Sequence, residues 1–186
     1  MEREKIVSYA CLSDIRRLHH KDGIVFVSGT YDLLHPGHVH FFELCKEYGN
    51  VLVVGVGCDA DIKRYKGETR PILAEHERLG LVAALEVVDY AFISYAPPLG
   101  VGHFLDGFIE IFQKLQPNIY VINDDTFDIH KRSELARAHD IKLVILSHST
   151  ACLRCRNVSA SQIMQRVFAA VCADQAKSSH FVYVGG

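Results

Sequence analysis

Two histidines three positions apart, His35 and His38, lie in a short segment that also contains Gly29, Thr30 and Asp32. Imidazoles can carry positive charge near neutral pH, which suits a transition state that spreads negative charge over phosphate oxygens. Gly29 would let the backbone approach a ligand closely, and Thr30 offers a hydroxyl and a backbone N–H to a phosphate. Asp32 is expected to fix the loop or to orient a histidine. The segment therefore predicts a site that handles phosphate groups.

The same segment lies where a strand is expected to give way to a helix. Residues 24–27 form an apolar run ended by Gly29, and residues 37–48 follow a helical pattern. Gly37 would then begin a helix, where free backbone N–H groups and the helix dipole favour an anion. Two alternatives are a helix start with two solvated histidines and a zinc pair, although no third zinc ligand is evident.

Nearly all-apolar strands alternate with helices along the rest of the chain. We expect strands at 51–56, 90–93, 119–122 and 142–146, and helices at 5–20, 59–65, 75–85, 101–115, 130–139 and from 158 or 159 to about 173. In helix 5–20 the candidate buried residues are Ile6, Ala10, Leu12, Ile15 and Leu18. This alternation predicts an α/β fold with a parallel five-stranded sheet covered by helices on both faces. Such sheets bind ligands beyond the carboxyl ends of the strands, where strand order reverses.

Composition sets further limits. The 186 residues fit a single domain, and a net charge of −2 gives no global basic field for nucleic acid or an anionic membrane. We see neither a secretory signal nor a run of about 18 apolar residues, so we expect no membrane span. Six scattered cysteines favour reduced thiols in the cytoplasm. Cys152 and Cys155 form a lone CxxC, for which a metal or redox role is the minor alternative.

A family resemblance follows from residues 29–38. They resemble the GTFDxxHxGH motif of the cytidylyltransferase-like nucleotidyltransferases, with Tyr31 in the usual Phe position. The resemblance covers roughly residues 23–170. It implies a Rossmann-like fold and an enzyme that joins a nucleoside triphosphate to a phosphorylated small molecule and releases pyrophosphate.

A second segment, Lys66 to Pro71, resembles the KGxxRP loop of heptose-phosphate adenylyltransferases and archaeal FAD synthetases. A lysine on such a loop can reach the triphosphate or the attacking phosphate, whereas the alternative is a solvated loop charge. Glu77 and Arg78 match the family segment that follows this loop. We expect Arg78 to support the site structurally rather than to take part in catalysis.

Two more segments complete the expected site. Asp124 or Asp125, after the fourth strand, would lie near the nucleotide and could bind ribose, the alternative being a simple turn. Residues 154–163 resemble the RTxGISTT motif that closes the site in cytidylyltransferases. There Arg154 could hold phosphate, Ser159 would cap the last helix, and Ser159 and Ser161 would bind phosphates.

The resemblance implies direct in-line displacement by a phosphate oxygen on the α-phosphorus, with Mg²⁺ carried by the nucleotide. The residues given catalytic roles are His35, His38, Lys66 and Arg154. The residues expected to bind the nucleotide are Gly29, Thr30, Tyr31, Asp32, Gly37, Asp124, Ser159 and Ser161.

The nucleotide is predicted to be CTP, because Arg154 lies in the closing motif, although the KGxxRP loop resembles users of ATP. The second substrate would be a small phosphorylated or phosphonylated alcohol, bound by residues around 96–103 and 125–130 and by the loop before Arg154. A homodimer is expected from relatives. From another class, the alternative is a nucleotide-binding module or flavodoxin-like carrier without turnover.

Overall fold

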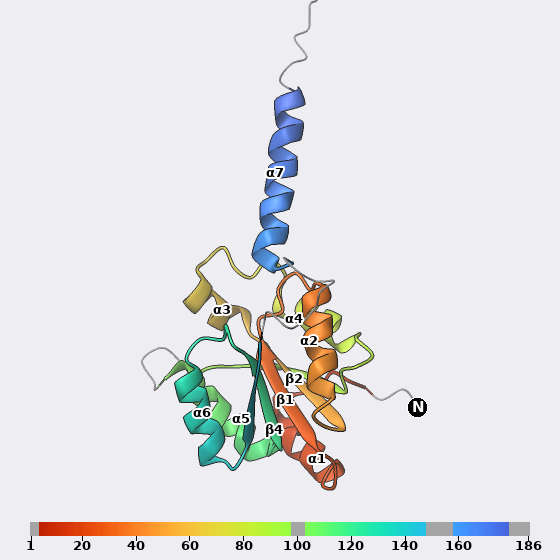
Figure 1. Ribbon diagram of the computed structural model, residues 1–186, viewed down its shortest axis with the longest axis vertical. Helices are drawn as coiled ribbons and strands as arrows, with labels where there is room; N and C mark the ends of the chain where they lie inside the picture. Colours follow the sequence, from red (N-terminus) through yellow and green to blue (C-terminus); the bar gives the residue numbers. More distant parts are fainter. Residues whose placement is uncertain (1–3, 98–102, 148–157, 179–186) are drawn as a thin grey trace, which may run out of the picture.

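A five-stranded, all-parallel sheet forms the centre of the protein (Figure 1). This computed structural model describes residues 4–97, 103–147 and 158–178. The strand order is β3-β2-β1-β4-β5. The strands are β1 (Ile24–Gly29), β2 (Val51–Gly57), β3 (Tyr90–Ser94), β4 (Ile119–Asn123) and β5 (Lys142–Leu146). From β1 the strands are added first on one side, as β2 and β3, and then on the other, as β4 and β5. The order thus reverses between β1 and β4, and the carboxyl ends of these two strands form the expected ligand-binding edge.

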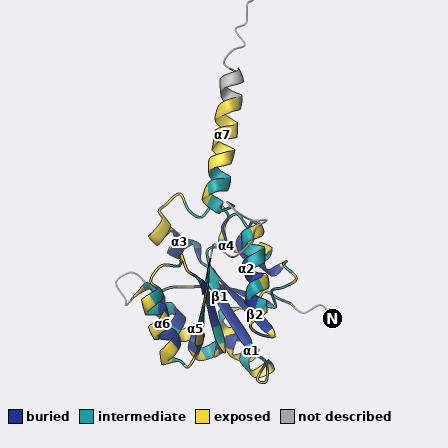
Figure 2. Cartoon of the chain, viewed as in Figure 1, coloured by how far each residue is buried: buried dark blue, intermediate teal, exposed yellow. Residues whose placement is uncertain are grey.

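Helices cover both faces of this sheet. One face packs against α2 (Pro36–Lys46) and α4 (Glu75–Ala83), through the alternate residues Val25, Val27 and Val54. The other packs against α1 (Leu12–Leu18), α5 (Gly107–Leu115) and α6 (Ile129–Ala138), through Phe26 and Tyr120. Because both faces are covered, β1 and β2 are buried except at their carboxyl ends (Figure 2). The predicted α/β, Rossmann-like fold is confirmed.

The amino-terminal prediction was wrong. Residues 5–7 are extended rather than helical, and Ile6 forms a parallel bridge with Ala91 of β3. Val7 donates its N–H to the Ala91 carbonyl, and Ala91 donates in turn to Lys5. A 3-10 turn (Tyr9–Cys11) then leads into α1. The unpaired edge of β3 offers these hydrogen bonds, which outweigh the helical pattern. Of the five residues predicted to be buried here, Leu12 and Ile15 are buried, whereas Ile6, Ala10 and Leu18 are exposed.

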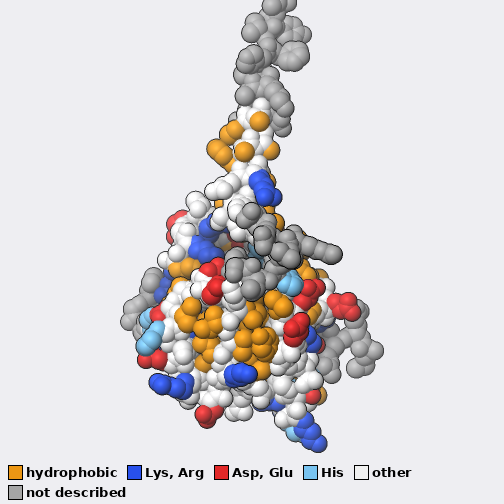
Figure 3. Space-filling view, in the orientation of Figure 1, with side chains coloured by type: hydrophobic (Ala, Val, Ile, Leu, Met, Phe, Trp, Pro, Cys, Tyr) orange, Lys and Arg blue, Asp and Glu red, His pale blue; other side chains and the backbone are white. Residues whose placement is uncertain are grey.

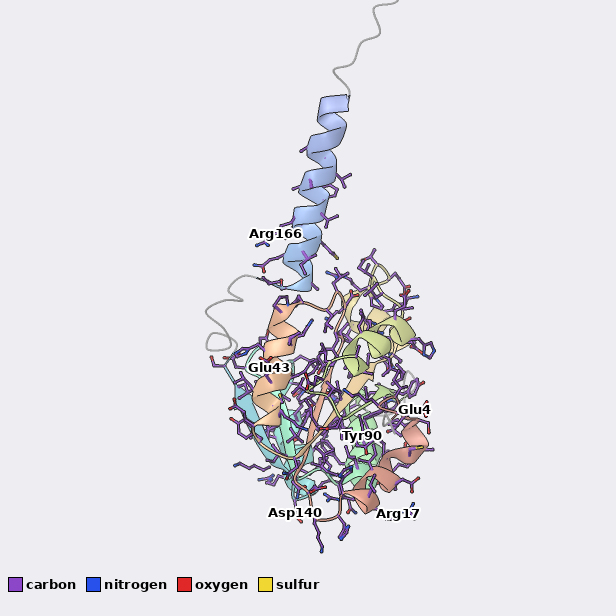
Figure 4. The ribbon with its side chains drawn as sticks, turned by 90° about the vertical axis from the view of Figure 1, so that its right-hand side faces the viewer. Glu4, Arg17, Glu43, Tyr90, Asp140 and Arg166 are labelled. Carbon is purple, nitrogen blue, oxygen red and sulfur yellow. The ribbon has the colours of Figure 1, made fainter. Side chains whose placement is uncertain are left out.

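The other helices lie close to their predicted ranges. Helix α3 (Asp59–Lys66) follows β2 directly. A 3-10 turn (Phe104–Asp106) precedes α5, so the helix expected from 101 begins as a tighter turn within the described residues. The last helix, α7 (Ala160–Ser178), is longer than predicted and extends away from the body. Figure 4 shows the same projection after a 90° turn, with Arg166 on α7.

None of the helices within the described ranges is long and apolar enough to cross a membrane.

Candidate active site

The two motif histidines lie together where α2 begins. His35 is the extended residue just before the helix, and His38 is in its first turn. Their rings are stacked, with centroids 3.8 Å apart and planes at 24°. Pro36 opens the helix, where the missing N–H of proline is not needed. The two imidazoles thus lie side by side as the spacing predicts, beside a helix end that favours an anion.

Burial, and then the nearby charges of His35 and Lys66, lowers the pKa of His38 to about 3. The Nδ1 atom of His38 is buried and has no hydrogen-bond partner among the residues the structure describes. His38 is therefore neutral in the free protein at neutral pH. The expectation that both imidazoles can carry positive charge therefore fails for His38 in the free protein, chiefly because its ring is buried.

The motif glycines make room for aromatic rings. A Cβ on Gly29 would lie 2.8 Å from the Tyr31 ring, and a Cβ on Gly37 would lie 3.1 Å from the His35 ring. Tyr31 has a left-handed backbone (φ 51°), and its buried ring packs edge-on against His38 at 5.5 Å. We predicted that Gly29 lets the backbone approach a ligand closely. On the α2 side of β1, the space beside Gly29 is filled by the Tyr31 ring.

Asp32 anchors the KGxxRP loop. Its carboxylate, 5% exposed, accepts backbone N–H bonds from Ile72 at 3.0 Å and Leu73 at 3.1 Å. Arg70 lies 3.2 Å from the same carboxylate and donates a second, longer bond to Ser161 at 3.4 Å. Asp32 was expected to fix its own loop or to orient a histidine, whereas the contacts of its carboxylate hold residues 70–73 instead. Three motifs distant in the sequence meet through Arg70.

The first turn of α7 lies beside the start of α2. Gln162 donates its N–H to the Ser159 hydroxyl at 3.2 Å, so Ser159 caps the helix as predicted. The carbonyl of Val158 is 3.7 Å from the place a Cβ on Gly37 would occupy. The N-termini of α2 and α7 therefore lie close together, and the dipoles of both helices favour an anion there.

Arg78 joins the backbone segments that surround the site. This fully buried side chain donates to the carbonyls of Leu73, Thr30 and Gly57 and to the carboxylate of Asp59, at 2.6 to 2.9 Å. It therefore ties the end of β1 to the end of β2 and to the loop before α4. The structural role predicted for Arg78 fits these contacts.

A cavity of about 370 Å³ opens on the α5 and α6 side of Thr30. It is lined by the ends of β1, β2 and β3, by Lys66, and by residues 125–127 after β4. Tyr65, Phe104 and Phe127 form an aromatic cluster on its wall, with ring centroids 5.4 to 6.0 Å apart. Its size suits a small molecule. Residues 96 and 125–127, expected near the second substrate, are part of this wall.

The predicted site residues not yet described are Thr30, Lys66, Asp124 and Arg154. Lys66 and Thr30 line the cavity, and the Thr30 hydroxyl is 2.7 Å from the Tyr65 hydroxyl. Desolvation, followed by the charge of Arg70, lowers the pKa of Lys66. Asp124 donates its backbone N–H to Leu146, while its neighbour Asp125 lines the cavity. Arg154 lies outside the described residues.

Two arginines at the site are absent from the residues predicted from the sequence. Arg70 contacts Asp32, and Arg132 of α6 lines the cavity. The signal for Arg70 is its place in the loop motif with Lys66. Arg132 carries no such signal, because only the fold brings α6 to the cavity.

These features define a Rossmann-like α/β protein whose predicted site residues gather at the carboxyl edge of its sheet. A family model described as cytidylyltransferase-like matches residues 26–166. The chain belongs to this cytidylyltransferase-like family, whose motif it carries at residues 29–38.

The chain is similar to curated bifunctional HldE proteins. It is 38% identical over 107 residues to HldE of Helicobacter pylori (strain Shi470), covering 58% of this chain and 21% of that protein. It is 50% identical over 70 residues to HldE of Geobacter metallireducens, covering 38% of this chain and 14% of that protein. The matches therefore span about a fifth or less of these relatives' length.

Among solved structures, the chain resembles a lipopolysaccharide core biosynthesis protein from Thermoplasma volcanium GSS1. The identity is 30% and the TM-score 0.53, covering 68% of this chain and 95% of that one. A pantoate-beta-alanine ligase from Francisella tularensis shares the fold at 17% identity, with a TM-score of 0.55, over 76% of this chain and 66% of that one.

Proposed function

We propose that the chain transfers a nucleotidyl group from a nucleoside triphosphate to a phosphorylated small molecule and releases pyrophosphate. The observation that carries the proposal is the link from Asp32 through Arg70 to Ser161. It gathers the HxGH segment, the KGxxRP loop and the start of α7 around one region. The family match supports a nucleotidyltransferase-like activity.

In the proposed reaction, an acceptor phosphate oxygen attacks the α-phosphorus in line, and the bond from that phosphorus to the oxygen bridging to the β-phosphate breaks. A phosphate monoester is already anionic, so the protein need not remove a proton. His35, His38 and the N–H groups that open α2 would contact the triphosphate. Lys66 and Arg154 would balance developing charge, and the N-terminus of α7 would hold the leaving pyrophosphate.

The nucleotide is the finer part of the proposal. The sequence alone favours CTP through Arg154, but two observations favour ATP as the second candidate. The KGxxRP loop, which resembles that of ATP users, is held in the site by Asp32. Neither of the two HldE relatives is named as a cytidylyltransferase.

For the acceptor, we propose that the cavity beside Thr30 and Lys66 holds a small phosphorylated, alcohol-like molecule. The Thermoplasma relative is described as a lipopolysaccharide core biosynthesis protein, which supports a sugar-like acceptor. We also propose that Mg²⁺ arrives with the nucleotide. Among the described residues, no group of three or more His, Cys, Asp or Glu side chains is arranged to hold a metal ion.

We further propose a homodimer formed through α7. Hydrophobic side chains are exposed along this helix: Phe168 is 71% exposed, and Val167 and Val171 lie beside it. Figure 3 shows hydrophobic side chains exposed along the projecting helix. Three residues at spacings of one and three form a helical stripe, and a second copy of the same stripe would cover it. Equilibrium sedimentation of the protein and of Phe168→Glu tests this, because a monomeric parent or a dimeric variant contradicts it.

The described cysteines Cys11, Cys45, Cys58 and Cys172 are free thiols, which supports a reducing compartment such as the cytoplasm as the proposed location.

The deciding experiment measures pyrophosphate release with CTP and with ATP over a panel of phosphorylated alcohols. We expect one nucleotide to be preferred at least about tenfold. We expect His38→Ala to lower turnover by about 10²-fold or more. His40→Ala, in the same helix, should keep near-normal rates. Nucleotide binding without pyrophosphate release would favour the non-catalytic alternative.

A further inference from the structure

The inner part of the cavity contains a buried cation. Arg132 of α6 is 4% exposed and lines the cavity wall. Its Nε–H donates to the Phe127 carbonyl at 3.0 Å, and its guanidinium donates to the Tyr120 hydroxyl. That hydroxyl is in turn 3.5 Å from the Ser28 hydroxyl at the end of β1. A short polar chain therefore runs from Arg132 to the first strand.

Two aromatic rings hold this guanidinium. Its central carbon lies 4.8 Å from the centroid of the Phe127 ring and 5.2 Å from that of the Phe108 ring. These contacts and the two hydrogen bonds fix the orientation of a planar group that has five N–H donors. Within the part of the chain that the structure describes, two of its five N–H groups have a hydrogen-bond partner, and the others can reach an oxyanion in the cavity.

Arg132 differs in its charge partners from the other arginines around the site. Arg64 pairs with Asp61 at 3.0 Å, Arg70 with Asp32 at 3.2 Å, and Arg78 with Asp59 at 2.6 Å. Within the described ranges, no carboxylate lies within ion-pair distance of Arg132. A buried charge without a counterion is costly, so an anion that supplies the missing charge would be bound strongly.

Arg132 and the motif groups come from different walls of the site. Lys66 lies at the end of α3 beside Thr30, where the attacking phosphate is proposed to arrive. Arg132 comes from α6, which packs on the face of the sheet opposite α2. A ligand that fills the cavity can therefore meet one cation with each of two separate groups.

We propose that the acceptor carries a second anionic group, a carboxylate or a further phosphate, which Arg132 binds. This inference rests on the proposed function and specifies its substrate class: a phosphorylated alcohol that also bears a carboxylate or a second phosphate, rather than one whose other end is neutral. Arg132 is then the residue that selects this acceptor, while the attacking phosphate is handled by Lys66.

The test compares acceptors of similar size that differ at one end. Glycerol 3-phosphate has a neutral end, 3-phosphoglycerate a carboxylate, and propane-1,3-diol bisphosphate a second phosphate. Calorimetry without nucleotide gives the dissociation constants, and pyrophosphate release with ATP and CTP gives the rates. We expect at least one of the two doubly anionic compounds to bind about tenfold tighter than glycerol 3-phosphate. Equal or undetectable binding of all three would overturn the inference.

Matched variants separate charge recognition from structure. Arg132→Gln should remove the preference, weakening the doubly anionic ligand about tenfold and glycerol 3-phosphate less than about threefold. Arg132→Lys, which keeps the charge, should retain part of the preference, and it serves as the test if the Gln variant does not fold. Arg137 is an exposed arginine on the same helix, and Arg137→Gln should leave the dissociation constants of both ligands unchanged. Equal weakening of both ligands by either Arg132 variant would show a structural role only.

The two proposals fail in different ways. Selective binding that depends on Arg132, without pyrophosphate release, would refute the transferase and leave the anion site intact. Pyrophosphate release with a neutral acceptor and no Arg132-dependent selectivity would support the transferase and refute the anion site at Arg132.

Discussion

Arg70 lies 3.2 Å from Asp32, and this pair connects the loop before α4 to the strand-to-helix turn that carries the histidines. The Asp32 carboxylate accepts backbone N–H hydrogen bonds from Ile72 and Leu73 of this loop. A single carboxylate therefore holds Arg70 and residues 72 and 73, and Arg70 in turn contacts Ser161 in the first turn of α7. The contacts around it and around the histidines can be tested by substitution.

Asp32→Asn should destabilise the fold by about 2–4 kcal/mol at pH 7, because it breaks a buried ion pair and turns an N–H toward backbone donors. Burial alone would raise the pKa of Asp32, but the N–H groups of Ile72 and Leu73 and the Arg70 guanidinium lower it overall. Its stabilising contribution is thus complete above about pH 4 and is lost as the pH falls through the lowered folded-state pKa. Urea unfolding at several pH values should show the difference between parent and variant shrinking below about pH 4. A constant difference would contradict the assignment, and exposed Asp14→Asn is the control.

His38→Gln should change how stability depends on pH. The folded protein holds the pKa of His38 at about 3, mainly through burial, whereas an unfolded histidine titrates near 6.5. Between these values the unfolded chain binds the extra proton, so the parent loses stability as the pH falls from about 6.5. Unfolding free energies at pH 7 and pH 5 should show a smaller loss in the variant than in the parent. His40→Gln should behave like the parent, and equal losses in all three proteins would refute the depressed pKa.

A methyl group at Gly37 should disturb the site more than the fold. The new Cβ of Gly37→Ala would lie 3.1 Å from the His35 ring, so the ring must shift by a few tenths of an ångström. We expect kcat/KM for pyrophosphate release to fall about tenfold, with stability changed by less than about 1 kcal/mol. Gly80→Ala in α4 meets nothing within 4 Å and should keep full activity, with a gain in stability of up to about 1 kcal/mol. Unchanged kinetics in Gly37→Ala would mean that the position of the His35 ring does not matter.

Replacing Arg78 by Met should cost about 3–5 kcal/mol, because three carbonyls and Asp59 would lose a buried donor. Thermal and urea unfolding would measure this. Arg17→Met, at an exposed arginine of α1, provides the comparison and should change stability by less than about 0.5 kcal/mol. A loss in Arg78→Met no larger than that of Arg17→Met would remove Arg78 from the framework of the site.

Much of the fold could be predicted, because strand and helix periodicities agree with the final packing. The runs at Ile24 and Val51 are apolar on both sides, as central parallel strands require. The failure at residues 5–7 has a tertiary cause, since Ala91 at the β3 edge supplies hydrogen bonds that no local pattern reveals. The length of α7 was also underestimated, because nothing in its sequence marks the stop.

For the site, the sequence predicted which motifs meet but not how they support one another. The placement of His35 with His38 and the cap by Ser159 followed from spacing alone. The filling of the space at Gly29 by Tyr31 did not, because it requires the left-handed turn at residue 31. Arg132 lies about a hundred positions after the motif, so only the folded chain shows it as part of the cavity.

Helix α7 projects from the body of the protein, while its first turn contacts the candidate site. Its first turn is held at one end by the contact of Ser161 with Arg70, and the described helix continues without glycine or proline to Ser178. A rigid rod fixed at its base transmits any tilt of its outer end to that base. In the dimer proposed through α7, a tilt of the outer end of the helix would change the position of Ser161, so that dimerisation would be coupled to the proposed activity.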